Sequence, residues 1–324
     1  MQLITRLRRL RRTPEIRRLL DMPFPAASKF VYPVFVVEGH GRREEIPSMP
    51  GQFRVSVDQL AQWVEPVAKQ GVGGLLLFGQ TEAEKDMAGS GAFNPRGAVQ
   101  QAVPLLKRAF PELVVMTDVC LCAYTSHGHC GPLDRHGQVD NDAACELLAK
   151  VALSHAQAGA DAVAPSAMMD GQIVAIREAL DENDFTQTLL MAYSTKFASS
   201  MYGPFRDAEN SSPSAGDRKG YQASYANLRA ALRESDLDED EGADILMVKP
   251  SLFYLDVLAK LRERTDLPVA AYNVSGEYSM LIAAAERGWG DLHGMVRESL
   301  MALDRAGADL IISYWASRYA EFAR

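Results

Sequence analysis

A glycine–alanine–aspartate segment occurs three times in this chain, each time between a helix-like stretch and an apolar run. The segments begin at Gly159, Gly242 and Gly307. Glycine commonly ends a helix, and a short polar turn then leads into a buried strand. Repeated helix-to-strand connections of this kind make successive strands run in the same direction. We therefore expect a parallel sheet covered by helices.

The strand candidates are short, continuous apolar runs, which is typical of strands covered on both faces. They are residues 74–78, 113–117, 162–165, 189–193, 245–248, 269–272 and 310–313. Helical periodicity separates many of them, at residues 142–158, 172–180, 251–264, 279–287 and 295–305. With an eighth strand expected around residues 291–293, this series favours an α/β (β/α)8 TIM barrel. A doubly wound dinucleotide-binding sheet is disfavoured, since no GxGxxG motif follows a strand.

The chain divides into an N-terminal arm, residues 1–28, and a single barrel domain, residues 29–324. An apolar strand-like run at 30–37 and a helix at 57–70 are expected to precede the first barrel strand. Residues 199–221 show no hydrophobic period and are rich in polar residues and glycine. A long irregular segment inside a compact domain is usually functional, so we expect a lid over the active site there.

Net charge limits the partners of the chain. The 324 residues carry a formal charge of −8, which argues against nucleic acid as a general partner. Arginines nevertheless crowd the arm, at Arg6, Arg8, Arg9, Arg11, Arg12, Arg17 and Arg18. A nucleic-acid arm and a transit peptide are alternatives, but the acidic remainder favours an arm that docks on another subunit. We expect a cytoplasmic protein, because neither a secretory signal nor a membrane-spanning apolar stretch is evident.

Two lysines stand at the ends of neighbouring predicted strands, where a barrel carries its chemistry. Lys249 closes the run 245–248, and Lys196 follows the run 189–192 after three polar residues. Burial and a second nearby ammonium both lower the pKa of a lysine, and a neutral amine can form a Schiff base with a ketone. The alternative for each lysine is a solvated charge at the rim.

Three of the four cysteines are clustered, which in a chain without an export signal indicates metal binding or catalysis rather than disulfides. They are Cys120, Cys122 and Cys130. Thiolates select zinc, and three of them leave one tetrahedral position open for water or substrate. Two alternatives are a closed structural site completed by His127 or His129, and free thiols in the core. Cys145 lies in a helical pattern and is expected to be a core residue.

Taken in chain order, these motifs resemble the porphobilinogen synthase (delta-aminolevulinic acid dehydratase) family. The resemblance runs nearly end to end. It covers residues 6–9, 48–51, 118–142, 164–171, 193–197, 247–250, 274–278 and 313–314. The family is a TIM barrel that condenses two molecules of 5-aminolevulinate to porphobilinogen, with loss of two waters, in tetrapyrrole (heme) biosynthesis. The resemblance therefore implies a lyase of this class.

The resemblance also implies roles for individual residues. Lys249 would form the Schiff base with the first substrate and Lys196 with the second, and Asp118 is placed with these catalytic residues. The carboxylate of the second substrate would be held by Arg206, Arg218 and Gln222, and that of the first by Ser275 and Tyr314. The remaining pocket residues would be Ser166, Tyr193, Tyr202, Phe205 and Tyr272.

Metal use and assembly follow from the same resemblance. Relatives that carry all three cysteines are zinc-dependent, so a catalytic zinc is implied at Cys120, Cys122 and Cys130. Many bacterial members bind an allosteric magnesium near a glutamate fifteen residues before the Schiff-base lysine, and Glu234 stands there. A solvated glutamate is the alternative. In this family the arm embraces a neighbouring subunit of a homo-octamer, in agreement with the docking interpretation of the arginines.

Two other function classes compete with this interpretation. A class I aldolase would also be a Schiff-base barrel with two lysines, but it does not account for three thiolates beside them. A non-enzymatic zinc protein, or a nucleic-acid binder acting through its arm, would depend on residues 1–20 for binding.

Overall fold

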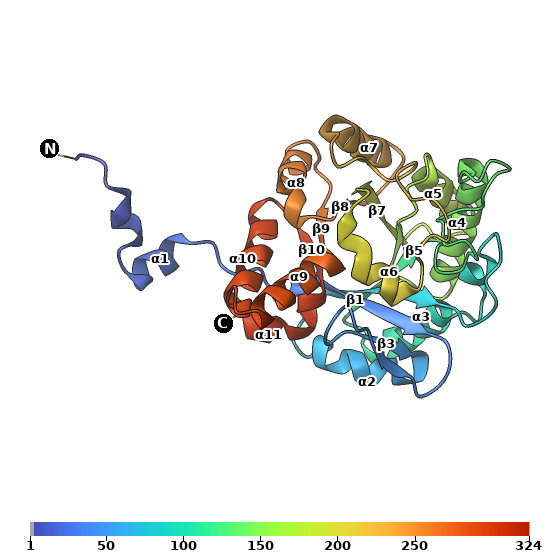
Figure 1. Ribbon diagram of the computed structural model, residues 1–324, viewed down its shortest axis with the longest axis horizontal. Helices are drawn as coiled ribbons and strands as arrows, with labels where there is room; N and C mark the ends of the chain where they lie inside the picture. Colours follow the sequence, from blue (N-terminus) through green and yellow to red (C-terminus); the bar gives the residue numbers. More distant parts are fainter. Residues whose placement is uncertain (1–2, 324) are drawn as a thin grey trace.

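The computed structural model describes residues 3–323 and shows the expected TIM barrel (Figure 1). Residues 1 and 2 of the predicted arm and residue 324 of the predicted domain lie outside the described part. Parallel strands follow one another around the barrel in the order β10-β9-β8-β7-β6-β5-β4-β1, and pairing of β10 with β1 closes the ring. The barrel strands are β1 Phe30–Val37, β4 Gly74–Gln80, β5 Val114–Val119, β6 Ala162–Pro165, β7 Leu189–Lys196, β8 Ile245–Lys249, β9 Val269–Asn273 and β10 Leu310–Ser313.

The first barrel strand lies earlier in the chain than predicted. The run at 30–37 is β1 itself: all eight residues are buried, and the strand pairs with β4 on one side and β10 on the other. The expected strand at 291–293 does not form, because Asp291 caps helix α10 and accepts a hydrogen bond from the backbone of Gly294 at 2.6 Å. No glycine–alanine–aspartate segment precedes β1, so the repeat that revealed other strands gave no sign of this one.

The three repeats form one recurrent turn. Their glycines have positive φ angles of 97°, 100° and 106°, a region that residues with a side chain rarely adopt. The backbone N–H of each aspartate donates to a residue at the start of an adjacent strand, and its carboxylate accepts from the N–H of that same residue. The pairs are Asp161 with Val115, Asp244 with Leu190 and Asp309 with Val269. Each aspartate thereby provides partners for both the backbone N–H and the carbonyl of one residue near the start of the adjacent strand.

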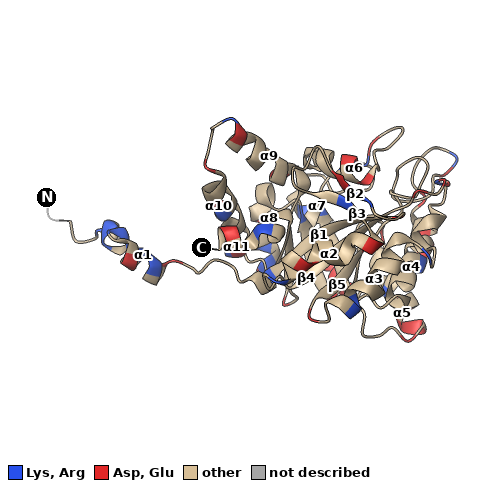
Figure 2. Cartoon of the chain, turned by 90° about the horizontal axis from the view of Figure 1, so that it is seen from below, with Lys and Arg blue, Asp and Glu red and all other residues tan. Residues whose placement is uncertain are grey.

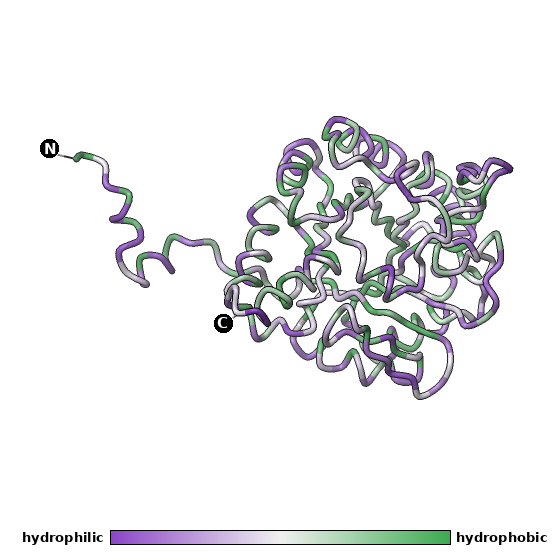
Figure 3. Tube along the Cα trace, in the orientation of Figure 1, coloured by the Kyte–Doolittle hydropathy of each residue, from purple (hydrophilic) through white to green (hydrophobic). Residues whose placement is uncertain are grey.

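Helices surround the ring of strands, and the tube in Figure 3 shows the apolar strands inside them. They are α2 Val57–Ala68, α3 Ala98–Ala109, α4 Asn141–Gln157, α5 Gln172–Glu182, α7 Leu228–Asp240, α8 Leu255–Arg262, α9 Ser275–Glu286, α10 Leu292–Arg305 and the short α11 Tyr319–Phe322. A small hairpin, β2 Arg43–Glu45 and β3 Phe53–Ser56, extends the sheet beside β1. In the described chain, every helix is too short or too polar to cross a membrane.

The arm extends away from the barrel (Figure 1). It contains a 3-10 turn at Leu7–Arg11 and helix α1 Pro14–Leu20, neither of which buries a residue. Figure 2 shows the basic residues of this segment. Apolar side chains are exposed beside them, including Ile4 at 91% and Leu19 at 82%. The described arm therefore presents both charge and apolar surface that its own barrel does not cover.

The predicted lid is partly helical rather than irregular along its whole length. It contains a 3-10 turn, η4 Ser200–Tyr202, and helix α6 Gly203–Glu209. A helix of seven residues is too short to show a hydrophobic period. Phe205 anchors it, with its ring 5.1 Å from that of Phe78 and 5.8 Å from that of Phe35. In Figure 1 α6 (yellow) lies across the middle of the barrel.

Candidate active site

Both candidate lysines lie at the carboxyl end of the barrel, here called the barrel mouth. Lys249 ends β8 and Lys196 ends the neighbouring β7, and the two are partners in the register of this parallel pair. Adjacent strands are about 4.8 Å apart, so the two side chains leave the sheet close together. Lys196 is 6% exposed and Lys249 2% exposed, which excludes the alternative of solvated rim charges.

A β-bulge in β7 brings the side chains of Tyr193 and Lys196 to the same face of the strand. Tyr193 and Lys196 are three residues apart, and in a regular strand they would point to opposite faces. The register between β7 and β8 shifts between Ala192 and Thr195, which adds the residue needed to turn both side chains to one face. The Nζ atom of Lys196 lies 5.6 Å from the centre of the Tyr193 ring, and that of Lys249 lies 4.9 Å from it.

The amine of Lys249 is enclosed by aromatic rings. The ring centres nearest to its Nζ belong to Tyr272 at 4.2 Å, Phe205 at 4.7 Å, Tyr193 at 4.9 Å, Tyr202 at 5.6 Å and Phe78 at 5.8 Å. Burial lowers the pKa of Lys249 to about 7, and the ammonium of Lys196 contributes in the same direction. A substantial fraction of this amine is therefore neutral, and nucleophilic, near neutral pH.

Asp118 is the carboxyl group that faces these amines. It lies in β5, in register with Ala164 of β6, although the predicted strand ended one residue earlier, at 117. Burial raises its pKa to about 6, although the charges of Lys196 and Lys249 act in the opposite direction. The loop after β6 contributes Ser166, whose carbonyl oxygen accepts a hydrogen bond of 2.5 Å from the Nζ of Lys196. Asp118 can therefore exchange a proton near neutral pH, under the influence of both lysine charges.

The lid brings two guanidinium groups and an amide toward the mouth. Arg206 belongs to α6, while Arg218 and Gln222 belong to the segment that follows it. The Nε atoms of both arginines, and both amide atoms of Gln222, are buried without a hydrogen-bond partner. Buried polar groups normally have partners, so unpaired donors in one region are suited to a polar ligand such as a carboxylate.

The opposite side of the mouth carries the remaining predicted pocket residues. Ser275 begins α9, and its hydroxyl accepts a hydrogen bond of 3.0 Å from the backbone N–H of Phe205 in the lid. The hydroxyls of Tyr272 and Tyr314 are 3.3 Å apart. Tyr202 donates to the carbonyl oxygen of Lys249 at 3.0 Å. The structure thus brings together at one mouth all the catalytic and substrate-binding residues predicted from the sequence.

The three clustered cysteines lie beside this mouth, in the loop after β5. Their sulfur atoms all lie within 4.8 Å of one another, and all three residues are buried. A tetrahedral zinc with Zn–S bonds of about 2.3 Å separates its sulfurs by about 3.8 Å, so the spacing fits that ion. Hydrogen bonds from the other two thiols, and then the cations Arg218 and Lys196, hold the pKa of Cys130 well below its usual range.

Neither nearby histidine joins the thiol cluster. The Nε2 of His127 faces the carbonyl of Met87 at 3.1 Å, and its Nδ1 accepts from the backbone of His129 at 3.1 Å. The ring of His129 lies between the hydroxyl of Tyr221, at 3.2 Å, and the carbonyl of Ala215, at 3.0 Å. Since all four ring nitrogens have partners, the closed site with histidine as a fourth ligand is not supported.

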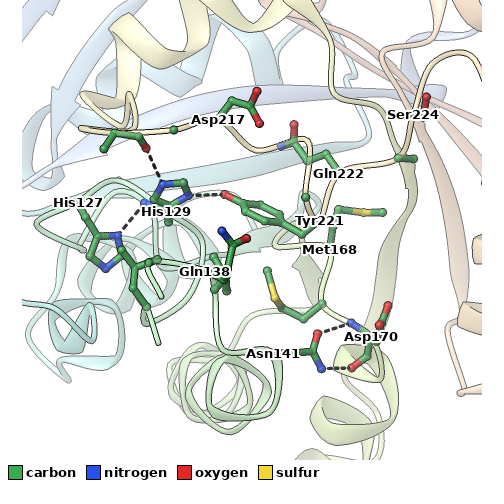
Figure 4. A pocket seen from close by; sticks show the side chains of 18 of the residues that line it. His127, His129, Gln138, Asn141, Met168, Asp170, Asp217, Tyr221, Gln222 and Ser224 are labelled. Atoms are coloured by element: carbon green, nitrogen blue, oxygen red, sulfur yellow. Dashed lines mark hydrogen bonds between the residues drawn. The ribbon is translucent and has the colours of Figure 1, made fainter. Parts of the chain in front are cut away.

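These histidines belong to the wall of a cavity of about 840 Å³ between the cysteine loop and the lid (Figure 4). Gln222 also lines this cavity, so the cavity reaches the side of the mouth where the lid arginines lie. On its far wall Asn141 exchanges two hydrogen bonds with the backbone of Asp170, at 2.8 and 2.9 Å.

Glu234 lines the same cavity from α7. Burial raises its pKa, and the neighbouring carboxylates Asp170 and Glu241 add to the rise. Across the described residues, only the three cysteines form a group of three or more metal-ligating side chains. Glu234 is therefore one carboxylate among acidic neighbours, without a preformed set of protein ligands around it.

Glu209, the last residue of α6, is a further candidate site residue that was not predicted. It is 4% exposed and lines a cavity of about 10 Å³ with Asp118, Cys120 and Cys122. Burial raises its pKa well above the usual range, and the negative charges of Cys122 and Asp118 raise it further. Its neighbours Ala208 and Asn210 give no sign that this side chain turns inward.

The fold and the site define a TIM barrel with two lysines and a carboxyl group at its mouth and three thiols beside them. The sequence matches the family described as delta-aminolevulinic acid dehydratase over residues 4–322, and the chain belongs to this family.

Individual relatives agree with this assignment. The chain is 50% identical over 320 residues to the delta-aminolevulinic acid dehydratase of Synechococcus elongatus, covering 98% of each chain. It is 52% identical over 313 residues to that of Methanothermobacter thermautotrophicus, covering 96% of this chain and 95% of that one. The crystal structure of the Toxoplasma gondii enzyme, in complex with the reaction product porphobilinogen, superposes with a TM-score of 0.95 at 44% identity, covering 99% of this chain and 92% of that one.

Proposed function

We propose that the chain is a porphobilinogen synthase, which condenses two molecules of 5-aminolevulinate to porphobilinogen with release of two waters. Family membership over residues 4–322 supports the activity. The observation that carries the proposal is the pair Lys196 and Lys249, in register at one barrel mouth and buried beside a common ring. No aldolase-like assignment accounts for the thiol cluster beside this pair.

Each lysine has a distinct task in this proposal. The neutral amine of Lys249 attacks the ketone of the first substrate, water leaves, and the resulting imine fixes that molecule. Lys196 forms the corresponding imine with the second substrate, which makes the carbon next to the imine easier to deprotonate. A pKa of about 6 suits Asp118 to accept and return a proton near neutral pH.

The carboxylates of the two substrates require separate partners. Arg206, Arg218 and Gln222 have unpaired buried donors, which supports their role at the second substrate. For the first substrate, Ser275 and Tyr314 offer hydroxyl donors on the opposite side of the mouth. Aromatic walls from Tyr193, Tyr202, Phe205 and Tyr272 exclude water from the reacting atoms, which strengthens the electrostatic interactions there.

Cys120, Cys122 and Cys130 would hold a catalytic zinc. Their sulfur spacing and burial support this role. A zinc held by these three thiolates would supply Lewis-acid chemistry for water or substrate beside the lysines. The lowered pKa of Cys130 favours loss of its proton, which zinc binding requires.

Glu234 would contribute to an allosteric magnesium site. Burial raises its pKa and its acidic neighbours Asp170 and Glu241 add to the rise; a divalent cation would relieve the repulsion among these carboxylates. Magnesium usually retains several waters and needs only one or two carboxylates, so the absence of a compact ligand set among the described residues is compatible with it.

The arm, residues 1–28, would dock on a second subunit in a homo-octamer, and the enzyme would act in the cytoplasm. The exposed apolar and basic side chains of the described part of the arm support docking, because apolar side chains exposed together in one segment usually mark an interface. The acidic remainder of the chain disfavours nucleic acid as the partner.

One assay tests substrate, reaction and metal together. Purified protein is given 5-aminolevulinate, and porphobilinogen is measured before chelation, after chelation and after zinc is returned. We expect activity, its loss and its recovery in that order. Failure of the untreated protein to form porphobilinogen would refute the proposed function, and full activity in metal-free protein would refute the zinc assignment alone.

A further inference from the structure

Helix α6 needs support from the rest of the molecule. It has seven residues, and isolated helices shorter than about 12 residues are marginal in water. Yet it carries Phe205 against Lys249 and Arg206 toward the mouth, so its position sets the geometry of two candidate site residues. The contacts that hold its two ends therefore bear on binding.

One arginine outside the barrel ring binds the carboxyl-terminal end of α6. The Nε of Arg54 donates to the carbonyl oxygen of Ala208 at 2.6 Å, and its Nη2 donates to that of Asp207 at 2.6 Å. Gln80, at the end of β4, donates to the same Ala208 carbonyl. The last carbonyl groups of a helix lack the partners found in its middle, so these side chains satisfy the Ala208 carbonyl and add a donor to that of Asp207, which also accepts from the backbone N–H of Asn210 at 3.3 Å.

Neighbouring contacts act at the same end. Ser48 donates to the carboxylate of Asp207 at 2.5 Å, and the Nζ of Lys85 donates to the carbonyl of Asn210 at 3.0 Å. Asn210 itself is left-handed, with φ 47° and ψ 45°, and ends the helix. The carboxyl end of a helix carries partial negative charge, which Arg54 and Lys85 complement.

The two residues that Arg54 holds lie between functional neighbours. Arg206 directly precedes Asp207, and the buried Glu209 directly follows Ala208. Burying the Glu209 carboxyl opposes closure of the helix over the mouth, because a buried acid loses its hydration. The hydrogen bonds from Arg54 to the carbonyl groups of Asp207 and Ala208 stabilise α6 next to Glu209, and so offset the cost of burying that carboxyl group.

We propose that Arg54 is a positioning residue that latches the lid closed by binding the carboxyl end of α6, and that it thereby orients Arg206 for the substrate carboxylate. The part about the substrate rests on the proposed function, whereas the latch itself does not. Arg54 is 154 positions from Ala208 in the chain, so no local pattern indicates this role.

Hydrogen–deuterium exchange of the substrate-free, full-length protein tests the latch. Three variants are compared with the wild type: Arg54→Ala, Arg54→Lys and Arg43→Ala. Arg43 is the matched control, because it lies in the same hairpin and stacks on Phe53 at 4.6 Å and Trp63 at 4.9 Å rather than on the lid.

In Arg54→Ala, amides of residues 203–211 should exchange about 10- to 100-fold faster, since two hydrogen bonds from a charged group are lost. Arg54→Lys should be intermediate, and Arg43→Ala should match the wild type. The KM for 5-aminolevulinate should rise by a similar factor in Arg54→Ala, with a smaller change in kcat.

Unchanged exchange of residues 203–211 in Arg54→Ala overturns the latch. Faster exchange throughout the barrel instead of in the lid overturns it as well, since it would show a structural role only. If Arg54→Ala does not fold, Arg54→Lys and Lys85→Met decide by the same comparison. Faster lid exchange with an unchanged KM rejects only the orientation of Arg206. A wild type that forms no porphobilinogen rejects the proposed function and leaves the exchange result standing.

Discussion

Replacing Lys196 by methionine should raise the pKa of Lys249. The two residues are partners in the register of β7 and β8, and both amines lie near the ring of Tyr193. Burial is the largest cause of the low Lys249 pKa, and the ammonium of Lys196 is the next. The variant removes the second cause and leaves the first in place.

The size of the effect follows from Coulomb's law. Two like charges about 5–8 Å apart, in surroundings with an effective dielectric constant of about 20, repel by about 2.1–3.3 kcal/mol. Since one pKa unit corresponds to about 1.4 kcal/mol, loss of the Lys196 charge should raise the pKa of Lys249 by about 1.5–2.4 units. The pKa of about 7 in the wild type would then move to about 8.5–9.5 in Lys196→Met. It should stay below the ordinary value of 10.5, because the amine is still buried.

Reductive trapping measures this shift. The protein is mixed with 5-aminolevulinate and cyanoborohydride at a series of pH values, and the modified Lys249 peptide is quantified by mass spectrometry. A group whose pKa is lowered becomes neutral at lower pH, so wild-type trapping should reach half its maximum near pH 7. The Lys196→Met midpoint should lie about 1.5–2.4 units higher.

Lys196→Arg is the matched control, because it keeps the positive charge and cannot form an imine with the substrate. Its midpoint should remain near that of the wild type. A midpoint in Lys196→Met that stays unchanged or moves downward would refute the electrostatic coupling of the two amines.

Four further predictions concern the metal sites, the arm and the fold. Cys130→Ser should lower the zinc content measured by elemental analysis, and a variant that retains the full zinc content of the wild type would argue against the site. Glu234→Ala should abolish stimulation by magnesium while activity without magnesium persists; a normal magnesium response would reject that role. Deletion of residues 1–20 should reduce the oligomer size seen by sedimentation, whereas a truncated protein of unchanged size would contradict docking. Asp244→Ala should lower the free energy of unfolding by about 1–3 kcal/mol, because the backbone N–H of Leu190 loses its acceptor; Asp244→Asn should lose less, and equal losses would contradict this explanation.

Much of the barrel was predictable because its signals are local. Glycines such as Gly159 end helices through positive φ angles, and the apolar runs that follow are buried on both faces. Lys249 was recognisable at its strand end for the same reason. The strand β1 was found as an apolar run but not as a barrel strand, since its place between β4 and β10 depends on how the ring closes.

The parts that could not be predicted depend on long-range contacts. The bulge in β7 that brings Lys196 and Tyr193 to one face follows from the register with β8. Burial of Glu209 and its approach to Cys122 follow from where α6 lies over the mouth. No pattern within seven residues could encode that position, which depends on partners such as Arg54 far away in the chain.

The most direct test of the account is to locate the substrate imines. Wild-type protein is treated with borohydride during turnover of 5-aminolevulinate, digested, and mapped by mass spectrometry. We predict reduced adducts on Lys249 and on Lys196, and on no other lysine. Adducts on different residues, or turnover that continues without any adduct forming, would contradict the two-lysine mechanism.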